Sequence, residues 1–416
     1  MKFIAIVFGK LSYSILRLVG RMAGTLPGLI AEKIDPNILN DSLSRLPKGV
    51  IVVTGTNGKT TTTKILTDML SAQYRVLTNP TGSNFTRGVA SVIVKESSLF
   101  GKLNFDIAVI ELDEAYAVKF VEKVKPKYSV ILNVSRDQMD RFGEIDYTAK
   151  LLEKVVAATQ TAVVLNADDT RVKSMDKVAK CKAFYFGVSK ELSSIFVNDE
   201  NLHTAKKHER KHVVDAELLS LTNNLTTFSL GKNKVSVKLN FFGVYNSQNA
   251  VAASLLAYNL GVDIKAIEAS LSETKPAFGR GEIFNLGSNQ IILQLVKNPS
   301  GFRQALLGSR AAAADMTCVV INDNYADGRD VSWLYDVSFK DYINSDETIT
   351  AGHRGYDMAV RLAYDDIFVN KTIEDLKIFV EFVSSQNNKT VLIYTTYTAM
   401  LKLRSLFDKM AQLERV

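Results

Sequence analysis

The sequence predicts an α/β fold with mainly parallel sheets, divided between two or three domains. Short apolar runs typical of buried strands alternate with segments of helical periodicity along nearly the whole chain. The 416 residues exceed what one domain of roughly 100–200 residues holds. Apolar residues make up 46% and charged residues 23%, an ordinary globular mixture, so disorder, collagen and coiled coil are excluded as the main state.

The charge balance and the cysteines narrow the class of protein. Lys and Arg together number 51 and Asp and Glu 44, which gives a net charge of +7. This mild surplus suits an anionic partner such as a nucleotide or a membrane surface, without selecting either. Cys181 and Cys318 are the only cysteines, so the sequence supports neither a disulfide framework nor a four-cysteine zinc site. A reducing, cytoplasmic compartment fits this usage.

The first expected element is an amphipathic helix from about Ile4 to Met22, within an N-terminal helical segment of residues 1–46. No stretch reaches the ~18 apolar residues that cross a bilayer. A secretory signal is disfavoured because no clear cleavage site follows a sufficient apolar run. Two alternatives stay open: the helix packs on its own domain, or it lies against a membrane with its basic residues facing lipid phosphates.

The next elements form a central domain, residues 47–283. After its strands, a weakly patterned and charged stretch at about Ser189–Glu217 is interpreted as an insertion or a β-rich excursion, and Phe242–Leu260 is helical again. The buried strands are expected at Val50–Val53, Ile107–Ile110, Val130–Leu132 and Ala162–Leu165.

A second series of strands and helices begins after Arg280 and forms a C-terminal domain, residues 284–416. The boundary is placed near Gly281–Gly287. Strands are expected at Ile291–Val296, Cys318–Ile321, Thr348–Ala351 and Val391–Tyr394.

The strongest chemical signal follows the first strand of the central domain and opens a helix. Glycines there let backbone N–H groups approach a phosphate, and the helix N-terminus adds a favourable dipole. Lys59 would reach the β- and γ-phosphates of ATP, and the Thr60 hydroxyl would bind Mg²⁺. The strict Walker spacing asks for a glycine at Val53, so the loop is a variant, and an ordinary tight turn is the plain alternative. The run is Gly55, Thr56, Asn57, Gly58, Lys59, Thr60 and Thr61.

Polar residues also follow three further strands. Glu111 ends the second strand and is a candidate Mg²⁺ ligand, the alternative being a solvated acidic turn. Clusters starting at Asn133 and Asn166 follow the next two strands. Because carboxyl ends of parallel strands point into the ligand crevice, four such clusters indicate one shared crevice.

These motifs resemble the central domain of the Mur ligases, which use ATP to make an acyl phosphate that an amine attacks. The resemblance implies a Mur ligase-type P-loop domain with a mainly parallel sheet, followed by a Rossmann-like α/β domain. It also implies that Asn249 contacts adenine and that Arg280 joins Lys59 in phosphoryl transfer. The matching segments are the phosphate loop, Glu111, Asp137–Asp140, Asn166–Asp169, Tyr245–Ala250 and Phe278–Arg280.

Two departures narrow the family. Gln138 stands where typical Mur ligases carry a histidine, and the loop begins so early that we expect their preceding substrate-binding domain to be absent. Asp137–Asp146, Lys297–Gly301 and Asn322–Trp333 are similar to the MurT family, the synthetase subunits of lipid II isoglutaminyl synthases. This resemblance implies amidation of the α-carboxylate of D-isoglutamate in lipid II, with ammonia from a GatD-type glutaminase subunit. No nucleic-acid partner is expected.

The segment Asn322–Trp333 also carries an implied catalytic residue. In the family, an aspartate of this segment is thought to reach the partner's glutaminase site, and we expect Asp330 to do so, with Asp327 as the alternative. The chain has no credible cysteine–histidine pair of its own. An apparent EF-hand start in this segment fails, because Tyr325 and Leu334 fall where calcium ligands are needed.

Two further metal-binding features of the family, a zinc ribbon and a carbamylated lysine, have counterpart segments in this sequence. Many family members carry a four-cysteine zinc ribbon, but here the stretch holds only His203, His208 and His212 among basic residues, so no zinc is predicted. Lys150 falls where ordinary Mur ligases place a carbamylated metal-binding lysine, and a plain surface lysine is the favoured alternative.

Two rival functions stay open: a stand-alone amino-acid ligase of Mur or folylpolyglutamate type, and a nucleotide-binding scaffold without chemistry. The expected location is the cytoplasm, with peripheral contact at the inner face of the cell membrane.

Overall fold

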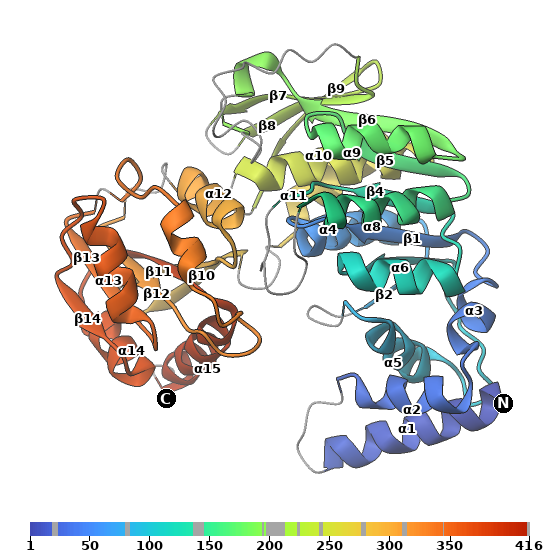
Figure 1. Cartoon of the computed structure of the whole chain (residues 1–416), viewed down its shortest axis with the longest axis horizontal. Helices are drawn as coiled ribbons and strands as arrows, with labels where there is room; N and C mark the ends of the chain where they lie inside the picture. Colours follow the sequence, from blue (N-terminus) through green and yellow to red (C-terminus); the bar gives the residue numbers. More distant parts are fainter. Residues whose placement is uncertain are drawn as a thin grey trace. The chain divides into compact units, whose positions relative to one another are not determined.

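The computed structural model describes residues 1–18, 24–79, 84–135, 145–193, 195–196, 213–222, 225–240, 244–275, 280–309, 314–343 and 345–413. These residues divide into two compact units (Figure 1). The first unit contains the described residues through Ser135, those from Ile145 to Leu239, and Asn246–Thr274. The second contains the described residues from Lys275 onward.

The first unit is built on a sheet whose described strands follow the order β2-β3-β1-β4-β5-β6-β7-β8-β9. Pairing is parallel from β2 through β7, and β7, β8 and β9 pair antiparallel. This antiparallel end begins where the sequence indicated a β-rich excursion. The strands are β1 (Gly49–Thr54), β2 (Val76–Thr78), β3 (Ile107–Glu111), β4 (Tyr128–Ile131), β5 (Ala162–Asn166), β6 (Lys182–Val188), β7 (Ala216–Thr222), β8 (Leu225–Leu230) and β9 (Asn233–Lys238).

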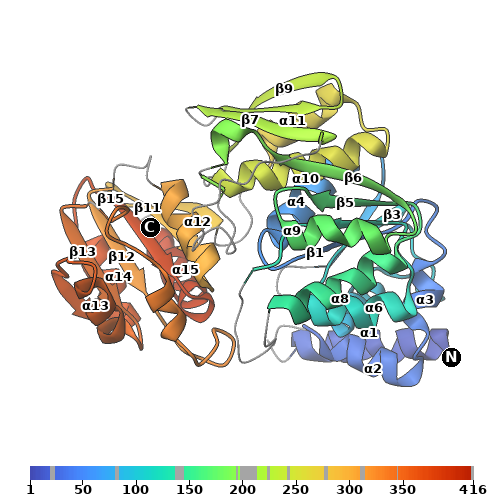
Figure 2. The same cartoon turned by 45° about the horizontal axis from the view of Figure 1, so that its top comes forward.

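Helices cover the parallel part of this sheet, because its strands are apolar on both faces. Figures 1 and 2 show α6 beside α8, and α4 lies next to α11. All residues of β1 and β3 are buried, as the continuous apolar runs predict. The helices are α4 (Lys59–Ser71), α5 (Thr86–Glu96), α6 (Glu114–Lys123), α8 (Ile145–Ala158), α9 (Thr170–Ser174), α10 (Val244–Asn259) and α11 (Ile264–Glu273), with short 3₁₀ turns at Met175–Val178 and Lys190–Leu192.

The N-terminal segment forms three helices that join the core of the first unit. They are α1 (Lys2–Leu18), α2 (Leu26–Ile34) and α3 (Ile38–Leu43), and all three pack against α5 or one another. Ile6 and Ile38 belong to the same buried cluster as Val52 of β1. The expected N-terminal helix is therefore present and packs on its own unit through one face. Among the described residues, no helix is long and apolar enough to span a bilayer.

The second unit contains a sheet whose described strands run in the order β10-β11-β15-β12-β13-β14. Only the β10–β11 pair is antiparallel. The chain moves outward from β12 to β13 and β14 and then returns to the other side of β12 as β15, so the strand order reverses between β12 and β15. The strands are β10 (Arg280–Leu286), β11 (Asn289–Leu295), β12 (Met316–Val320), β13 (Glu347–Ala351), β14 (Lys371–Ile373) and β15 (Thr390–Thr395).

Helices α12 (Pro299–Ser309), α13 (Gly355–Ala363), α14 (Leu376–Ser384) and α15 (Tyr397–Leu413) accompany this second sheet, with a 3₁₀ turn, η4 (Ser332–Asp336). Two separate buried clusters lie within the unit, around Cys318 and around Phe302. An α/β fold with mainly parallel sheets is confirmed in both units. The strand β10 spans the sequence-based boundary near Gly281–Gly287.

Candidate functional site

The phosphate loop connects β1 to α4 and needs glycine at two positions. Gly55 and Gly58 have φ values of +127° and +87°, a region that side-chain-bearing residues rarely adopt. A Cβ added at Gly58 would lie 2.3 Å from the Asn249 side-chain oxygen, Oδ1. Gly58 therefore gives room for Asn249 of α10 to lie directly against the loop, although the two residues are far apart in sequence.

Lys59 is buried at the centre of the loop. Its ammonium nitrogen donates to the Gly55 carbonyl at 2.6 Å and the Thr56 carbonyl at 3.2 Å. It also lies 3.4 Å from Oε2 of Glu114, which is itself buried at the start of α6. A buried cation needs such partners. Glu114 belongs to the acidic cluster after β3, but its spacing from Lys59 in the sequence does not predict this pairing.

Thr60 and Glu111, the two predicted Mg²⁺ ligands, lie side by side. The Thr60 hydroxyl donates to Oε1 of Glu111 at 2.9 Å. The Asn84 amide lies 3.4 Å from the same oxygen. Asn79 fixes the backbone of Glu111 through two hydrogen bonds of 2.9 Å each. Hydroxyl, carboxylate and amide oxygens are the donors that Mg²⁺ prefers, so this group fits the ion.

The polar cluster after β4 holds the phosphate loop from its other side. Asn133 Oδ1 accepts from the Asn57 N–H at 2.8 Å, and the Asn133 amide donates to the Asn57 carbonyl at 3.0 Å. The Asn133 carbonyl also accepts from the Thr56 N–H at 3.0 Å. The Thr56 hydroxyl then bonds the backbone of Ser135. These contacts fix the loop, so Asn133 is a positioning residue.

The cluster after β5 is a second brace. Asp169 accepts from the Val134 N–H at 2.8 Å and caps α9 through the Val172 N–H at 3.0 Å. Asp168 accepts from the Val188 N–H at 2.6 Å. Since β3, β1, β4 and β5 are neighbours in the sheet, the four polar clusters do meet at one edge. Two of the clusters shape this edge through backbone contacts.

The start of α4 suits a bound phosphate group. The first turn of α4 contains no acidic residue, and the capping residue Gly58 offers no side-chain acceptor to the first N–H groups. The helix dipole favours an anion at these N–H groups, although the Glu111 carboxylate also approaches the first turn through the Thr60 hydroxyl. Within the described residues the buried Thr61 hydroxyl also has no hydrogen-bond partner. These features fit the phosphates of ATP.

A pocket of about 540 Å³ lies between α2, α5 and α6. The Phe85 and Tyr116 rings meet edge to face there, with centroids 4.4 Å apart. Asn84 and Glu114, which contact Glu111 and Lys59, are close in sequence to these two aromatic residues. The pocket is lined by Thr25, Glu32, Phe85, Thr86, Arg87, Tyr116, Lys119, Glu122 and Lys123.

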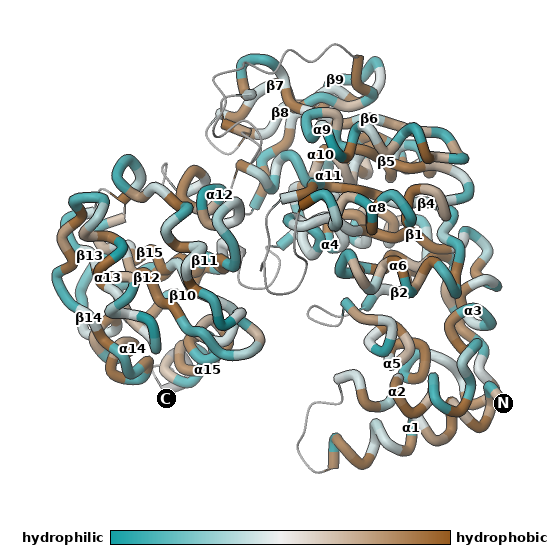
Figure 3. Tube along the Cα trace, viewed as in Figure 1, coloured by the Kyte–Doolittle hydropathy of each residue, from teal (hydrophilic) through white to brown (hydrophobic). Residues whose placement is uncertain are grey.

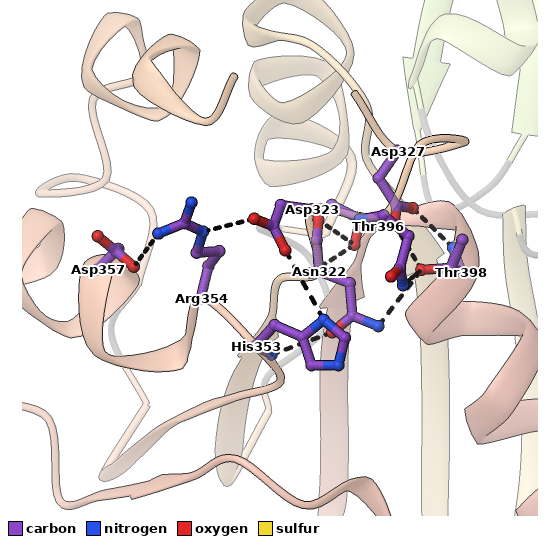
Figure 4. Close-up of polar contacts among 9 residues, drawn as sticks. Asn322, Asp323, Asp327, His353, Arg354, Asp357, Thr396 and Thr398 are labelled. Carbon is purple, nitrogen blue, oxygen red and sulfur yellow. Dashed lines mark hydrogen bonds and ion pairs between the residues drawn. The ribbon is translucent and has the colours of Figure 1, made fainter. Parts of the chain in front are cut away.

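The second unit presents the segment after β12, which Figure 4 shows in close-up. Asp327 is buried, and its carboxylate accepts from the Thr398 N–H at 2.7 Å and the Asn324 N–H at 3.1 Å. The Thr398 hydroxyl donates to it as well. Burial raises the pKa of Asp327, while these hydrogen bonds oppose the rise. Asp327 thus ties the segment to the start of α15, between β12 and β15.

Asp330 lies in the exposed part of the same segment. Its Oδ1 accepts from the Ser332 N–H at 2.8 Å, and hydrogen bonds from Ser332 lower the pKa of Asp330. Tyr325 and Arg329 are exposed in the same segment. Of the two aspartates considered from the sequence, Asp330 is the accessible one and Asp327 is held inside.

A third group of side chains stands beside this segment. Asp323 accepts from Arg354 Nε at 2.9 Å and lies 3.7 Å from His353 Nδ1 (Figure 4). Gly352 has φ +86°, and a Cβ there would lie 2.7 Å from the Ile321 carbonyl. His353 and Arg354 follow β13, so their distance from Asp323 in the sequence hides this group.

Neither cysteine is placed as a nucleophile. Cys318 is fully buried in β12, and burial strongly raises the pKa of its thiol. Burial also raises the pKa of Cys181. A thiol with a raised pKa forms little of the reactive thiolate. The absence of a cysteine–histidine pair from the chain stays a prediction.

Several predicted residues lie outside the described part of the chain. They are the side chain of Arg280, the Asp137–Asp140 cluster, Phe278 and Gly279, and the three histidines His203, His208 and His212. The histidines lie in the stretch for which no zinc is predicted, so this too stays a prediction. Lys150 is described and lies exposed on α8. Its carbamylation, and contact of Asn249 with adenine, stay predictions.

Comparisons with known protein families and sequences bear on these features. The Mur ligase middle domain matches residues 53–257, and the MurT ligase C-terminal domain matches residues 295–400. A lipid II isoglutaminyl synthase (glutamine-hydrolyzing) subunit MurT of Streptococcus pneumoniae is 32% identical, covering 97% of this chain and 96% of that protein. The subunit of the same name from Staphylococcus aureus strain COL is 28% identical, with 89% of each covered.

Solved structures agree on the fold. MurF from Acinetobacter baumannii has a TM-score of 0.70 at 18% identity, covering 92% of this chain and 80% of that one. MurF from Thermotoga maritima in complex with ADP also has a TM-score of 0.70, at 17% identity, covering 92% of this chain and 85% of that one. The chain therefore belongs to the MurT family of ligase subunits, built on the Mur ligase fold and acting in peptidoglycan synthesis.

Proposed function

We propose that this ligase uses ATP and Mg²⁺ to amidate the α-carboxylate of D-isoglutamate in the lipid II stem peptide, so that this residue becomes D-isoglutamine. The ammonia would come from a GatD-type glutaminase subunit. The observation that carries the proposal is the meeting of Lys59, Thr60 and Glu111 at the start of α4. The names of the two MurT relatives, which specify lipid II and glutamine hydrolysis, supply the substrate class.

The reaction begins with phosphoryl transfer. The substrate carboxylate oxygen attacks the γ-phosphorus of ATP, the bond to the β-phosphate oxygen breaks, and ADP leaves. Backbone N–H groups at the start of α4 and the Lys59 ammonium stabilise the charge on the phosphoryl oxygens. Thr60 and Glu111 would hold Mg²⁺, which supplies further charge neutralisation. By the family resemblance, Arg280 would assist.

Amide formation follows. Ammonia attacks the acyl carbon of the acyl phosphate, a proton leaves its nitrogen, and inorganic phosphate departs with the electrons of the carbon–oxygen bond. Phosphorylation is needed because an unmodified carboxylate would have to expel oxide, which is a very poor leaving group. The residues of the site hold the phosphoryl group while ammonia approaches.

The pocket between α2, α5 and α6 is the proposed site of the peptide end of the substrate. Its lining includes the cations Arg87 and Lys119 as well as the carboxylates Glu32 and Glu122, and Lys123 is paired with Glu32 at 3.2 Å. Phe85 and Tyr116 supply an apolar surface. A stem peptide carries carboxylates that cations attract. The pocket's closeness to Asn84 and Glu114 would bring one carboxylate toward the phosphate loop.

Asp330 is the proposed contribution to the glutaminase subunit. Its carboxylate is exposed and has a lowered pKa, so it would be ionised and able to orient a partner histidine. Asp327 is buried against Thr398, which favours an anchoring role for it. The exposure of the Asp330 side chain thus supports the prediction that the motif gave.

A two-stage experiment tests the proposal. Lipid II is first incubated with the purified chain, ATP, Mg²⁺ and an ammonium salt, and its mass is measured. We expect one carboxylate to become a carboxamide, and Lys59→Ala to slow this by about a hundredfold or more. ATP-dependent addition of an amino acid would instead show a stand-alone Mur or folylpolyglutamate-type ligase. ATP binding with neither product would favour a scaffold.

The second stage adds glutamine and the GatD-type subunit. Asp330→Asn should abolish glutamine-dependent amidation while leaving amidation by ammonium intact. Asp323→Asn, an aspartate of the same segment, is the matched control and should keep both activities. Loss of neither activity in Asp330→Asn would refute its proposed role. ATP use and the lipid-linked substrate place the reaction, in this proposal, in the cytoplasm at the inner membrane face.

A further inference from the structure

Helix α1 is amphipathic in an unusual sense, because its small residues face inward. Ala5 and Gly9 are buried together with Ile6. A Cβ at Gly9 would lie 2.8 Å from Val94 of α5, so glycine there allows the two helices to approach closely. Packing of α1 on its own unit therefore uses few large side chains. Ile6 is the large apolar residue that faces inward, and six others lie on the opposite side.

The outward face of α1 is a continuous apolar surface. Six large side chains at helical spacing point away from the unit, and Phe100 of the loop after α5 stacks on Phe3 at 5.9 Å between ring centroids. Figure 3 shows α1 as largely hydrophobic along its length. The exposed fractions are Phe3 50%, Ile4 46%, Phe8 52%, Leu11 54%, Ile15 51%, Leu18 87% and Phe100 85%. We call these seven side chains the α1 face.

Soluble proteins rarely expose a large contiguous apolar patch, and such patches mark interaction sites. A single exposed apolar side chain needs no explanation, but six large apolar side chains on one side of one helix do. A helix of this length would run about 26 Å along a surface. The α1 face therefore needs an occupant.

The charged residues of α1 indicate what binds the α1 face. Helix α1 contains no acidic residue, and Phe3, Lys10 and Arg17 lie seven residues apart, along one edge of the helix. Lys10 donates to the Lys95 carbonyl at 3.0 Å, so its cation stays at that edge. Lys95 lies beside Arg17 but is paired with Glu96 at 2.9 Å.

Apolar side chains with a basic edge are the pattern of helices that lie in the plane of an anionic membrane. We propose that the α1 face binds the surface of a bilayer containing anionic phospholipids, with α1 lying parallel to it. The apolar side chains enter the boundary between headgroups and acyl chains, and Lys10 and Arg17 contact lipid phosphates. This attachment does not depend on the proposed amidation.

Vesicle flotation with the full chain tests this proposal. We expect the chain to float with vesicles of phosphatidylcholine and phosphatidylglycerol, and less with phosphatidylcholine alone. The double variant Phe8→Ser, Ile15→Ser should lower the partition coefficient by at least about tenfold. Arg17→Gln should reduce only the part of binding that added salt removes.

The matched control is Phe368→Ser, Ile378→Ser, which removes two similarly exposed side chains from the second unit. It should bind vesicles as the unchanged chain does. ATP binding and the thermal midpoint of all variants report on folding, independently of lipid. Equal binding by both double variants, or no binding by the unchanged chain, would overturn the proposal. A dimer that the α1 variant alone converts to a monomer, without vesicle binding, would assign the face to a second copy instead.

Discussion

At the scale of single residues, Gly58 and Asp327 show how one position can fix a site. Gly58 combines a positive φ with a close approach of Asn249. Asp327 combines burial with three donors from two segments. In both cases the neighbour that matters comes from a distant element.

Gly58→Ala should impair nucleotide binding more than folding. A side chain at φ +87° costs about 1–2 kcal/mol, and the added methyl group also displaces Asn249 from the loop. We expect the affinity for ATP, measured by titration calorimetry, to fall by about tenfold or more. Gly261→Ala is the control, because Gly261 has φ +88° but nothing within 4 Å of its Cβ position. Equal affinities in the two variants would contradict the role of the Asn249 approach.

Asp327 should make the second unit less stable as the pH rises. Its folded-state pKa is raised by burial, so the folded protein holds this proton more tightly than the unfolded chain. The stabilisation is fully present below the ordinary aspartate pKa and is lost as the pH rises through the raised folded value.

The measurement compares the unchanged chain with Asp327→Asn by urea unfolding from acid to neutral pH. The asparagine side chain of the variant does not titrate. As the pH rises, the free energy of unfolding of the unchanged chain should therefore fall relative to that of Asp327→Asn. Asn offers fewer acceptors and should itself cost about 1 kcal/mol at acid pH. A difference that does not change with pH would show that Asp327 does not titrate in this range.

At the scale of elements, η4 is held by one buried arginine. Arg361 of α13 donates from Nε to the Leu334 carbonyl at 3.1 Å and pairs with Asp365 at 2.8 Å. Because η4 directly follows Asp330, this anchor also fixes the end of the exposed segment. Helix α13, which connects β13 to β14, thus supports the segment around Asp330 through the side chain of Arg361.

Arg361→Leu should destabilise the second unit by about 3–5 kcal/mol, since it removes the cation paired with Asp365 and the donor of two backbone carbonyls. Arg354, at the same helix and also paired with aspartates, is only partly buried, so Arg354→Leu should cost at most about 1 kcal/mol. Thermal unfolding of both variants checks this. Similar losses in the two would mean that burial of Arg361 is not what makes it important.

At the scale of the whole molecule, ATP should stabilise chiefly the first unit, which carries the phosphate loop. A ligand at a hundred times its dissociation constant adds about 2.7 kcal/mol to the unit that binds it. We expect Mg²⁺ and ATP to slow amide hydrogen exchange at residues 55–62 and β1, and to leave β12 and β15 unchanged. Lys59→Ala should remove the effect. Equal protection in β12 and β15 would show that the nucleotide couples the two units.

Most of the fold could be predicted because its signals are local. The runs Val50–Val53 and Ala162–Leu165 are strands, and the loop between β1 and α4 begins and ends where its glycines indicate. The sequence did not predict β2, β6, β8, β9, β10 and β14, and it indicated β7 only as part of a possible β-rich excursion. Their alternating or mixed patterns are weak where one face is exposed, and pairing partners decide them.

The sequence by itself determined the phosphate loop, the buried parallel strands and the family, because residue type and close spacing are enough to specify a glycine turn, an apolar strand and a motif. Only the tertiary structure decided that Glu114 faces Lys59, that Asp327 is buried while Asp330 is exposed, and that α1 turns its large apolar side chains outward. These features depend on which distant elements pack together. Burial and charge pairing arise from that packing, and no local pattern carries it.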